Sequence, residues 1–164
     1  MNSSNKIKVL FVCMGNICRS PLAEGVFCRL LADNDLTDRF IVDSAGTSNY
    51  HVGDAPDQRA VVAATNAGVK LHHCARQFVK EDFENFDYIM VMDHLNYESV
   101  LNLTNNHCYH EKVFLYRTFD NESVDFQNVP DPYYGGSSDF SEVLDIVTKA
   151  GLGFLDFLRE QHRL

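Results

Sequence analysis

The segment from Ile7 to Cys13 constrains the fold most, because every one of its residues except Lys8 is apolar. An apolar run of this length, without alternation, is typical of a strand that helices cover on both faces, as in parallel sheets. A loop follows. Ser20 and Pro21 then stand where an N-cap serine and a first-turn proline are favoured. The start of the chain therefore predicts a strand, a loop and a helix that begins with a serine cap.

The remainder of the chain continues this alternation. Further strands are expected at 40–44, 87–93 and 112–116, where apolar residues dominate again. Apolar residues at helical spacing predict a last helix that covers the sheet, and a long loop is expected over 120–138. Other helices are expected at about 56–67, 80–85 and 95–103. The pattern predicts a single α/β domain over 1–164 with a mainly parallel sheet, in which residues 1–6 form a flexible leader.

Composition limits the partners and the compartment. The 164 residues include 23 acidic and 14 basic side chains, and the formal net charge of −9 would repel nucleic acid. The N-terminal apolar run is too short to cross a bilayer, and no signal-peptide cleavage site follows it. The five cysteines form neither a disulfide framework nor paired zinc ligands. We therefore expect a cytoplasmic protein with no cofactor, no metal, no nucleic-acid partner and no membrane partner.

The loop after the first strand places Cys13 at the strand end and Arg19 at the start of a helix. Its N–H groups can point inward at an anion, the helix dipole adds positive charge, and Gly15 and Asn16 tolerate a left-handed backbone. Arg19 offers a bidentate fork for two phosphoryl oxygens. The same field favours Cys13 as a thiolate, although a lone cysteine in this position could also be a core residue. The expected phosphate-binding residues are Met14, Gly15, Asn16, Ile17, Cys18, Arg19 and Ser20.

A thiolate that attacks phosphorus expels an oxygen leaving group, which departs more easily when an acid protonates it. Asp131 is the candidate acid, because two prolines fix it in the long loop and Tyr133 and Tyr134 follow it. The local alternative is an ordinary Asp-Pro turn with exposed tyrosines. Taken with the cysteine loop, the pattern predicts phosphate ester hydrolysis.

These motifs closely resemble the low-molecular-weight protein tyrosine phosphatase family, over about Ile7 to Leu158. The resemblance implies a flavodoxin-like, doubly wound, four-stranded parallel sheet flanked by helices. It also implies metal-independent hydrolysis of phosphotyrosine through a cysteinyl-phosphate intermediate. Met14 departs from the leucine more usual in the family, and 120–128 cannot be aligned with it. The most specific segments are Val12–Pro21, Asp43–Thr47, Phe86–Ile89, Met92–Asp93 and Asp131–Gly135.

By this match Cys13 attacks the phosphorus, Arg19 binds the phosphoryl group, and Asp131 protonates the leaving oxygen and then activates water. Ser20 would donate a hydrogen bond to the Cys13 sulfur. The resemblance also implies that Cys13 and Cys18 bridge on oxidation. Four residues would support the loop: Asn16, Ser44, His73 and Asp93. Three would form the walls of the substrate pocket: Tyr50, Tyr133 and Tyr134.

The expected partners are phosphotyrosine proteins or small aryl phosphates, with inorganic phosphate as product. Arsenate reductases share this fold and this loop, but they need further cysteines close together, whereas Cys74 and Cys108 are far apart in the sequence. A non-catalytic phosphotyrosine-binding module would not keep Cys13, Arg19 and Asp131 together. A sugar-transport phosphocarrier would not need both the arginine and the acid. These readings remain alternatives to the phosphatase.

Overall fold

The computed structural model describes residues 5–123, 125 and 127–164. The first four residues of the leader expected at 1–6 lie outside the described residues. The sheet consists of four parallel strands in the order β2-β1-β3-β4, which confirms the predicted doubly wound arrangement. The strands are β1 (Ile7–Cys13), β2 (Phe40–Gly46), β3 (Tyr88–Val91) and β4 (Val113–Leu115).

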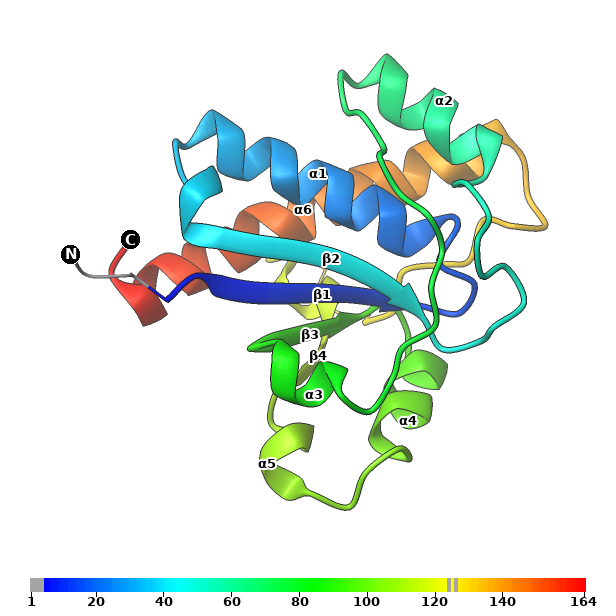
Figure 1. Cartoon of the computed structure of the whole chain (residues 1–164). Helices are drawn as coiled ribbons and strands as arrows, with labels where there is room; N and C mark the ends of the chain where they lie inside the picture. Colours follow the sequence, from blue (N-terminus) through cyan, green and yellow to red (C-terminus); the bar gives the residue numbers. More distant parts are fainter. Residues whose placement is uncertain (1–4, 124, 126) are drawn as a thin grey trace.

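Helices cover both faces of the sheet (Figure 1). On one face lie α1 (Arg19–Asp33), α2 (Gln58–Asn66) and α6 (Ser137–His162). On the other lie α3 (Asp82–Asn85), α4 (His94–Leu101) and α5 (His107–His110). Sequence patterning did not predict α5, because a single turn has no apolar period to detect. Short 3-10 helices at Thr37–Arg39 and Tyr116–Phe119 precede β2 and follow β4.

The central position of β1 in the sheet explains why its sequence is apolar at consecutive positions. Val9 and Phe11 pack into the core beneath α1 and α6, whereas Leu10 and Val12 pack into the core on the opposite face. All four side chains are fully buried. A strand with both faces covered needs apolar residues at consecutive positions, and β1 has them.

The start of α1 differs from the prediction. The helix begins at Arg19, its N-cap residue is Cys18, and no side chain caps it. Ser20 lies within the first turn, and its hydroxyl contacts the Cys13 sulfur instead of a helix N–H group. The prediction of Ser20 as N-cap was therefore wrong, because the helix already begins at Arg19 and the Ser20 hydroxyl lies against the sulfur at the centre of the preceding loop.

The carboxyl ends of the strands meet at one end of the molecule, on the right in Figure 1. The chain leaves β1 for β2 on one side and returns to β3 on the other side. In open α/β sheets this reversal leaves a crevice at the carboxyl ends of the two diverging strands. Cys13 ends β1, and Asp93 lies two residues beyond β3. Within the described part of the chain, no helix is both long enough and apolar enough to cross a membrane.

Candidate active site

The loop between β1 and α1 curls around the Cys13 sulfur. Asn16 adopts a left-handed φ of 58° at the turn, whereas Gly15 is not among the glycines with positive φ. Asn16 alone therefore makes the turn that both residues were expected to make. Its backbone N–H donates to Cys13 Sγ at 3.2 Å. An inward-pointing amide is the feature that an anion-binding loop requires.

Ser20 reaches the same sulfur from the first turn of α1. Its Oγ lies 3.0 Å from Cys13 Sγ and accepts a hydrogen bond from Asn16 Nδ2 at 2.8 Å. Because the serine oxygen already accepts from the amide, its hydrogen is free to be donated to the sulfur. Two donors therefore converge on Cys13, which favours a negatively charged sulfur.

The buried Asn16 side chain connects the loop to the rest of the protein. Its Nδ2 also donates to Ser44 Oγ at 3.0 Å, two residues before the end of β2. Its Oδ1 accepts from His73 Nε2 at 2.8 Å and from the Arg76 backbone N–H at 3.0 Å. The predicted supporting residues Ser44 and His73 thus both contact Asn16.

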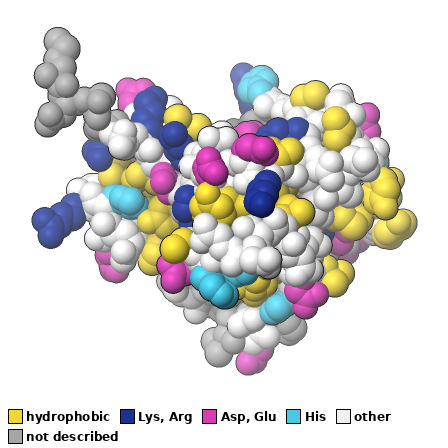
Figure 2. Space-filling model, turned by 60° about the horizontal axis from the view of Figure 1, so that its bottom comes forward, with side chains coloured by type: hydrophobic (Ala, Val, Ile, Leu, Met, Phe, Trp, Pro, Cys, Tyr) yellow, Lys and Arg dark blue, Asp and Glu magenta, His cyan; other side chains and the backbone are white. Residues whose placement is uncertain are grey.

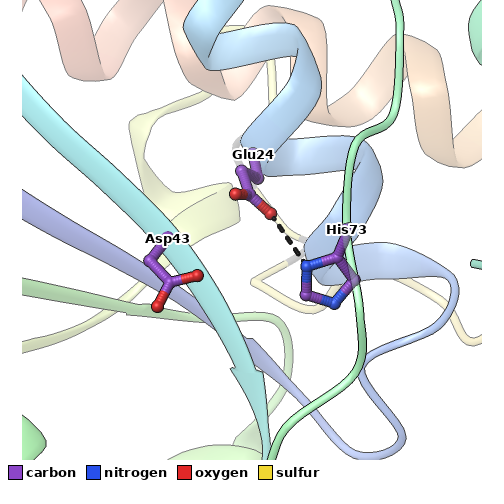
Figure 3. A group of neighbouring side chains, drawn as sticks. All are labelled: Glu24, Asp43 and His73. Atoms are coloured by element: carbon purple, nitrogen blue, oxygen red, sulfur yellow. Dashed lines mark ion pairs between the residues drawn. The ribbon is translucent and has the colours of Figure 1, made fainter. Parts of the chain in front are cut away.

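An acidic residue that sequence reasoning missed lies behind this network. Glu24 from α1 faces His73, and its Oε2 lies 3.5 Å from His73 Nδ1 (Figure 3). The same oxygen accepts from Ser44 Oγ at 2.7 Å. Burial raises the pKa of Glu24 to about 7, and burial lowers the pKa of His73. His73 Nε2 faces only oxygen acceptors on Asn16, so this nitrogen carries a proton.

Glu24, His73 and Asp43 form the one cluster of possible metal ligands among the described residues (Figure 3). Asp43 already accepts from Arg76 Nε at 3.0 Å, and Glu24 already accepts from Ser44. The charges of the cluster therefore have protein partners. We interpret it as part of the support beneath the phosphate loop, in which Glu24 holds Ser44 and His73 holds Asn16 in place.

Arg19 is buried beside the loop. Its Nη1 donates to Asp93 Oδ2 at 2.6 Å and to the Val129 carbonyl at 3.0 Å. Asp93 is itself fixed as the N-cap of α4, where its Oδ1 accepts from Asn96 N at 2.8 Å. Asp93 therefore lies where a residue that braces the arginine should lie. Arg19 Nη2 points toward Asp131, whose Oδ2 is 3.6 Å away.

Asp131 and the three tyrosines lie around a cleft of about 270 Å³ above the loop. Asp131 is partly exposed, and its Oδ1 accepts from the Tyr133 backbone N–H at 3.1 Å. Tyr134 is 94% exposed and Tyr50 is 79% exposed, so both stand at the mouth of the cleft. The lining consists of Cys13, Met14, Gly15, Ile17, Cys18, Arg19, Tyr50, His51, Asp131, Tyr133 and Tyr134.

The second loop cysteine is buried below the cleft. Burial, with smaller contributions from the negative charges of Asp57 and Cys13, raises the pKa of Cys18 to about 12. Cys18 is therefore a neutral thiol at physiological pH. Its surroundings differ from those of Cys13, whose sulfur contacts Ser20 Oγ and the Asn16 backbone N–H.

Comparison with known proteins identifies the family to which a chain with this site belongs. The family model described as "Low molecular weight phosphotyrosine protein phosphatase" matches residues 8–164. The chain belongs to this phosphatase family.

Individual relatives agree along most of the chain. A protein of Synechocystis named a putative low molecular weight protein-tyrosine-phosphatase is 43% identical over 88% of this chain and 91% of the relative. The low molecular weight phosphotyrosine protein phosphatase of Sus scrofa is 41% identical, over 92% of this chain and 95% of the relative. The phosphatase family therefore accounts for nearly the whole sequence.

Solved structures match the fold equally well. A protein tyrosine phosphatase from Entamoeba histolytica has a TM-score of 0.91 and 40% identity, covering 95% of this chain and 99% of that one. A Drosophila arginine phosphatase has a TM-score of 0.86 and 31% identity, covering 93% of this chain and 98% of that one. The phosphatase fold thus serves proteins named for two different phosphorylated side chains.

Within this phosphatase fold, every predicted site residue lies in the loop, its support or the cleft. Sequence reasoning missed His51, which lines the cleft, and Arg76 and Glu24, which support the loop. It also missed Arg59, which contacts the loop of Asp131. None of the four belongs to a contiguous motif, so only their long-range contacts identify them.

Proposed function

We propose that this chain is a protein-tyrosine phosphatase that hydrolyses phosphotyrosine monoesters without a metal, through a cysteinyl-phosphate. The observation that carries this proposal is the convergence of Ser20 Oγ and Asn16 N on the Cys13 sulfur, at 3.0 and 3.2 Å, on the floor of a cleft. A sulfur held in this way is an activated nucleophile. The cleft places it within reach of an anion bound by the loop.

The first step transfers the phosphoryl group to sulfur. The Cys13 thiolate attacks phosphorus, the bond from phosphorus to the phenolic oxygen breaks, and protonated Asp131 gives its proton to that oxygen. Arg19 Nη1 is already bound to Asp93 and Val129. We therefore assign Nε and Nη2 to the phosphoryl oxygens, where a planar fork stabilises charge in the transition state.

The second step releases inorganic phosphate. Asp131, now a carboxylate, accepts a proton from a water molecule whose oxygen attacks phosphorus. The bond from phosphorus to sulfur breaks, and the Cys13 thiolate leaves with the hydrogen bond from Ser20. The thiolate and the protonated Asp131 are thereby restored for the next cycle.

Tyrosine phosphate fits the cleft better than phosphoarginine does. Tyr50, Tyr133 and Tyr134 supply aromatic surface for a flat ring, and Met14 and Ile17 add apolar walls. A guanidinium group would need several acceptors along these walls. The likeness to the Drosophila arginine phosphatase nevertheless makes phosphoarginine the comparison substrate. We also propose that the protein acts in the cytosol, where its five free cysteines would stay reduced.

The test is hydrolysis by the purified protein of matched peptides that carry phosphotyrosine, phosphoserine or phosphoarginine, with and without EDTA. Phosphotyrosine should be the preferred substrate, EDTA should change nothing, and Cys13→Ser should abolish turnover because serine is not ionised in this field. Asp131→Asn should reduce kcat/KM for phosphotyrosine by roughly 10²-fold or more, and reduce it much less for p-nitrophenyl phosphate.

A different experimental result would contradict each part of the proposal. Turnover by Cys13→Ser would contradict the thiolate mechanism. A preference for phosphoarginine would contradict the substrate. Equal losses on both aryl substrates in Asp131→Asn would show that this residue transfers no proton. Reduction of arsenate with thiols, in place of ester hydrolysis, would assign the site to redox chemistry.

A further inference from the structure

We propose that Arg59 is a positioning residue for the general acid: it holds Tyr133, and through Tyr133 it places the Asp131 carboxylate beside Arg19. The inference rests on the proposed function, in which Asp131 transfers a proton. It concerns a residue of α2 that lies outside the cleft and outside every motif found in the sequence.

Arg59 donates two hydrogen bonds to the backbone of the loop that carries Asp131. Its Nη2 donates to the Tyr133 carbonyl at 2.9 Å, and its Nη1 donates to the Gly135 carbonyl at 3.1 Å. Both acceptors belong to the segment between Asp131 and the start of α6. A planar guanidinium that binds two carbonyls of one loop restricts how that loop can rotate.

Tyr133 connects Arg59 to Asp131 through hydrogen bonds of its backbone. Its carbonyl accepts from Arg59, and its own N–H donates to Asp131 Oδ1 at 3.1 Å. Asp131 Oδ2 then lies 3.6 Å from Arg19 Nη2. One carboxylate oxygen is thus fixed by the backbone that Arg59 holds, which orients the other toward the phosphate site.

Arg59 is itself fixed relative to the phosphate loop. Asp57 accepts from Arg59 Nε at 3.0 Å and from Nη2 at 2.9 Å. The Asp57 backbone N–H donates to the Ile17 carbonyl at 2.8 Å. The residue whose carboxylate binds Arg59 is therefore itself hydrogen-bonded to the loop that surrounds Cys13. These hydrogen bonds from Arg59 lower the pKa of Asp57, which therefore stays charged. Arg59 and Asp57 together connect the acid to the nucleophile's loop.

Two aromatic rings complete the site of the guanidinium. Its Cζ lies 4.6 Å from the ring centroid of buried Phe140 and 5.7 Å from that of Tyr133. A lysine at this position would keep the charge but lose the paired hydrogen bonds and the flat stacking surface. Arg59→Lys is therefore the sharpest perturbation, because it loosens the loop while it preserves the charge near the cleft.

The experiment measures kcat/KM of wild type and Arg59→Lys on a series of aryl phosphates, from p-nitrophenyl phosphate to phenyl phosphate. Phenol resembles the tyrosine side chain, with a pKa of about 10, and so needs the acid most. Misplacement of the acid should cost roughly tenfold or more on phenyl phosphate. The same variant should lose less than about threefold on p-nitrophenyl phosphate, which leaves with little help. Arg159→Lys, at the far end of α6, is the matched control and should resemble wild type on every substrate.

Two further variants separate positioning from general destabilisation. In an Asp131→Asn background, Arg59→Lys should have almost no further effect on phenyl phosphate, because the acid through which it acts is already absent. Arg59→Ala should regain part of its lost activity on phenyl phosphate when guanidinium chloride is added at low concentration, and sodium chloride at equal ionic strength should not restore it.

The outcomes are distinguishable. The positioning role would be overturned if Arg59→Lys lost activity equally on all aryl phosphates, or if its effect were undiminished in the Asp131→Asn background. The proposed function would still stand in that case, because wild type would hydrolyse aryl phosphates through Cys13. If wild type itself failed to hydrolyse aryl phosphates, the proposed function would fail first. A selective loss on phenyl phosphate that vanishes in the Asp131→Asn background would establish Arg59 as a positioning residue.

Discussion

Replacement of Asn16 by alanine should be among the most destabilising single changes in the protein. The side chain is fully buried and makes four hydrogen bonds, to Ser20, Ser44, His73 and the Arg76 backbone. At about 1 kcal/mol each, their loss costs about 4 kcal/mol. Alanine at a φ of 58° adds about 1 kcal/mol of backbone strain. The free energy of unfolding should therefore fall by roughly 5 kcal/mol.

The two contributions can be measured separately by urea denaturation. Asn16→Gly removes the same hydrogen bonds but adopts the left-handed backbone without strain, so it should be about 1 kcal/mol less destabilising than Asn16→Ala. Asp35 is the matched control, because it is exposed and has a φ of 56°. Asp35→Ala should lower the free energy of unfolding only by the backbone strain, about 1 kcal/mol. If Asn16→Ala destabilised the protein no more than Asp35→Ala does, the amide network would contribute nothing to stability, and its role as support for the loop would be refuted.

Two other predictions concern Cys18 and Tyr116. Mild peroxide should inactivate the enzyme reversibly, because a Cys13 sulfenic acid condenses with the Cys18 thiol and releases water. Since burial holds the pKa of Cys18 at about 12, the thiolate fraction rises with pH, and the bridge should close faster at pH 8 than at pH 6.5. Peptide mapping that joined Cys13 to Cys28, or full recovery of Cys18→Ser with thiol after peroxide, would exclude this pair. The hydroxyl of buried Tyr116 has no hydrogen-bond partner among the described residues, so Tyr116→Phe should raise the free energy of unfolding by about 1 kcal/mol. A thermal melt that showed lower stability would mean that the hydroxyl is satisfied in solution.

The sequence by itself determined the elements whose signals are local. The apolar run of β1 required a strand covered on both faces, and the structure buries Val9 through Val12 completely. Cys13 and Arg19 were identified as a pair because one short loop carries both, directly before a helix. Asp131 was singled out by its two prolines and its place in a long loop. Contiguous residues produce recognisable patterns, because the chain itself fixes their separation in space.

The tertiary structure decided which distant residues meet. Ser44 and His73 were assigned only through family resemblance, and their contacts with Asn16 depend on β2 and on the segment before β3 reaching the same loop. Ser20 was expected both as a helix cap and, by family resemblance, as a partner of the Cys13 sulfur, and in the structure it has only the second role. Arg59 binds carbonyls 74 and 76 positions away, and no local pattern encodes such a contact. Which carbonyl or carboxylate a side chain finds is set by the packing of helices on the sheet, and that packing exists only once the chain has folded.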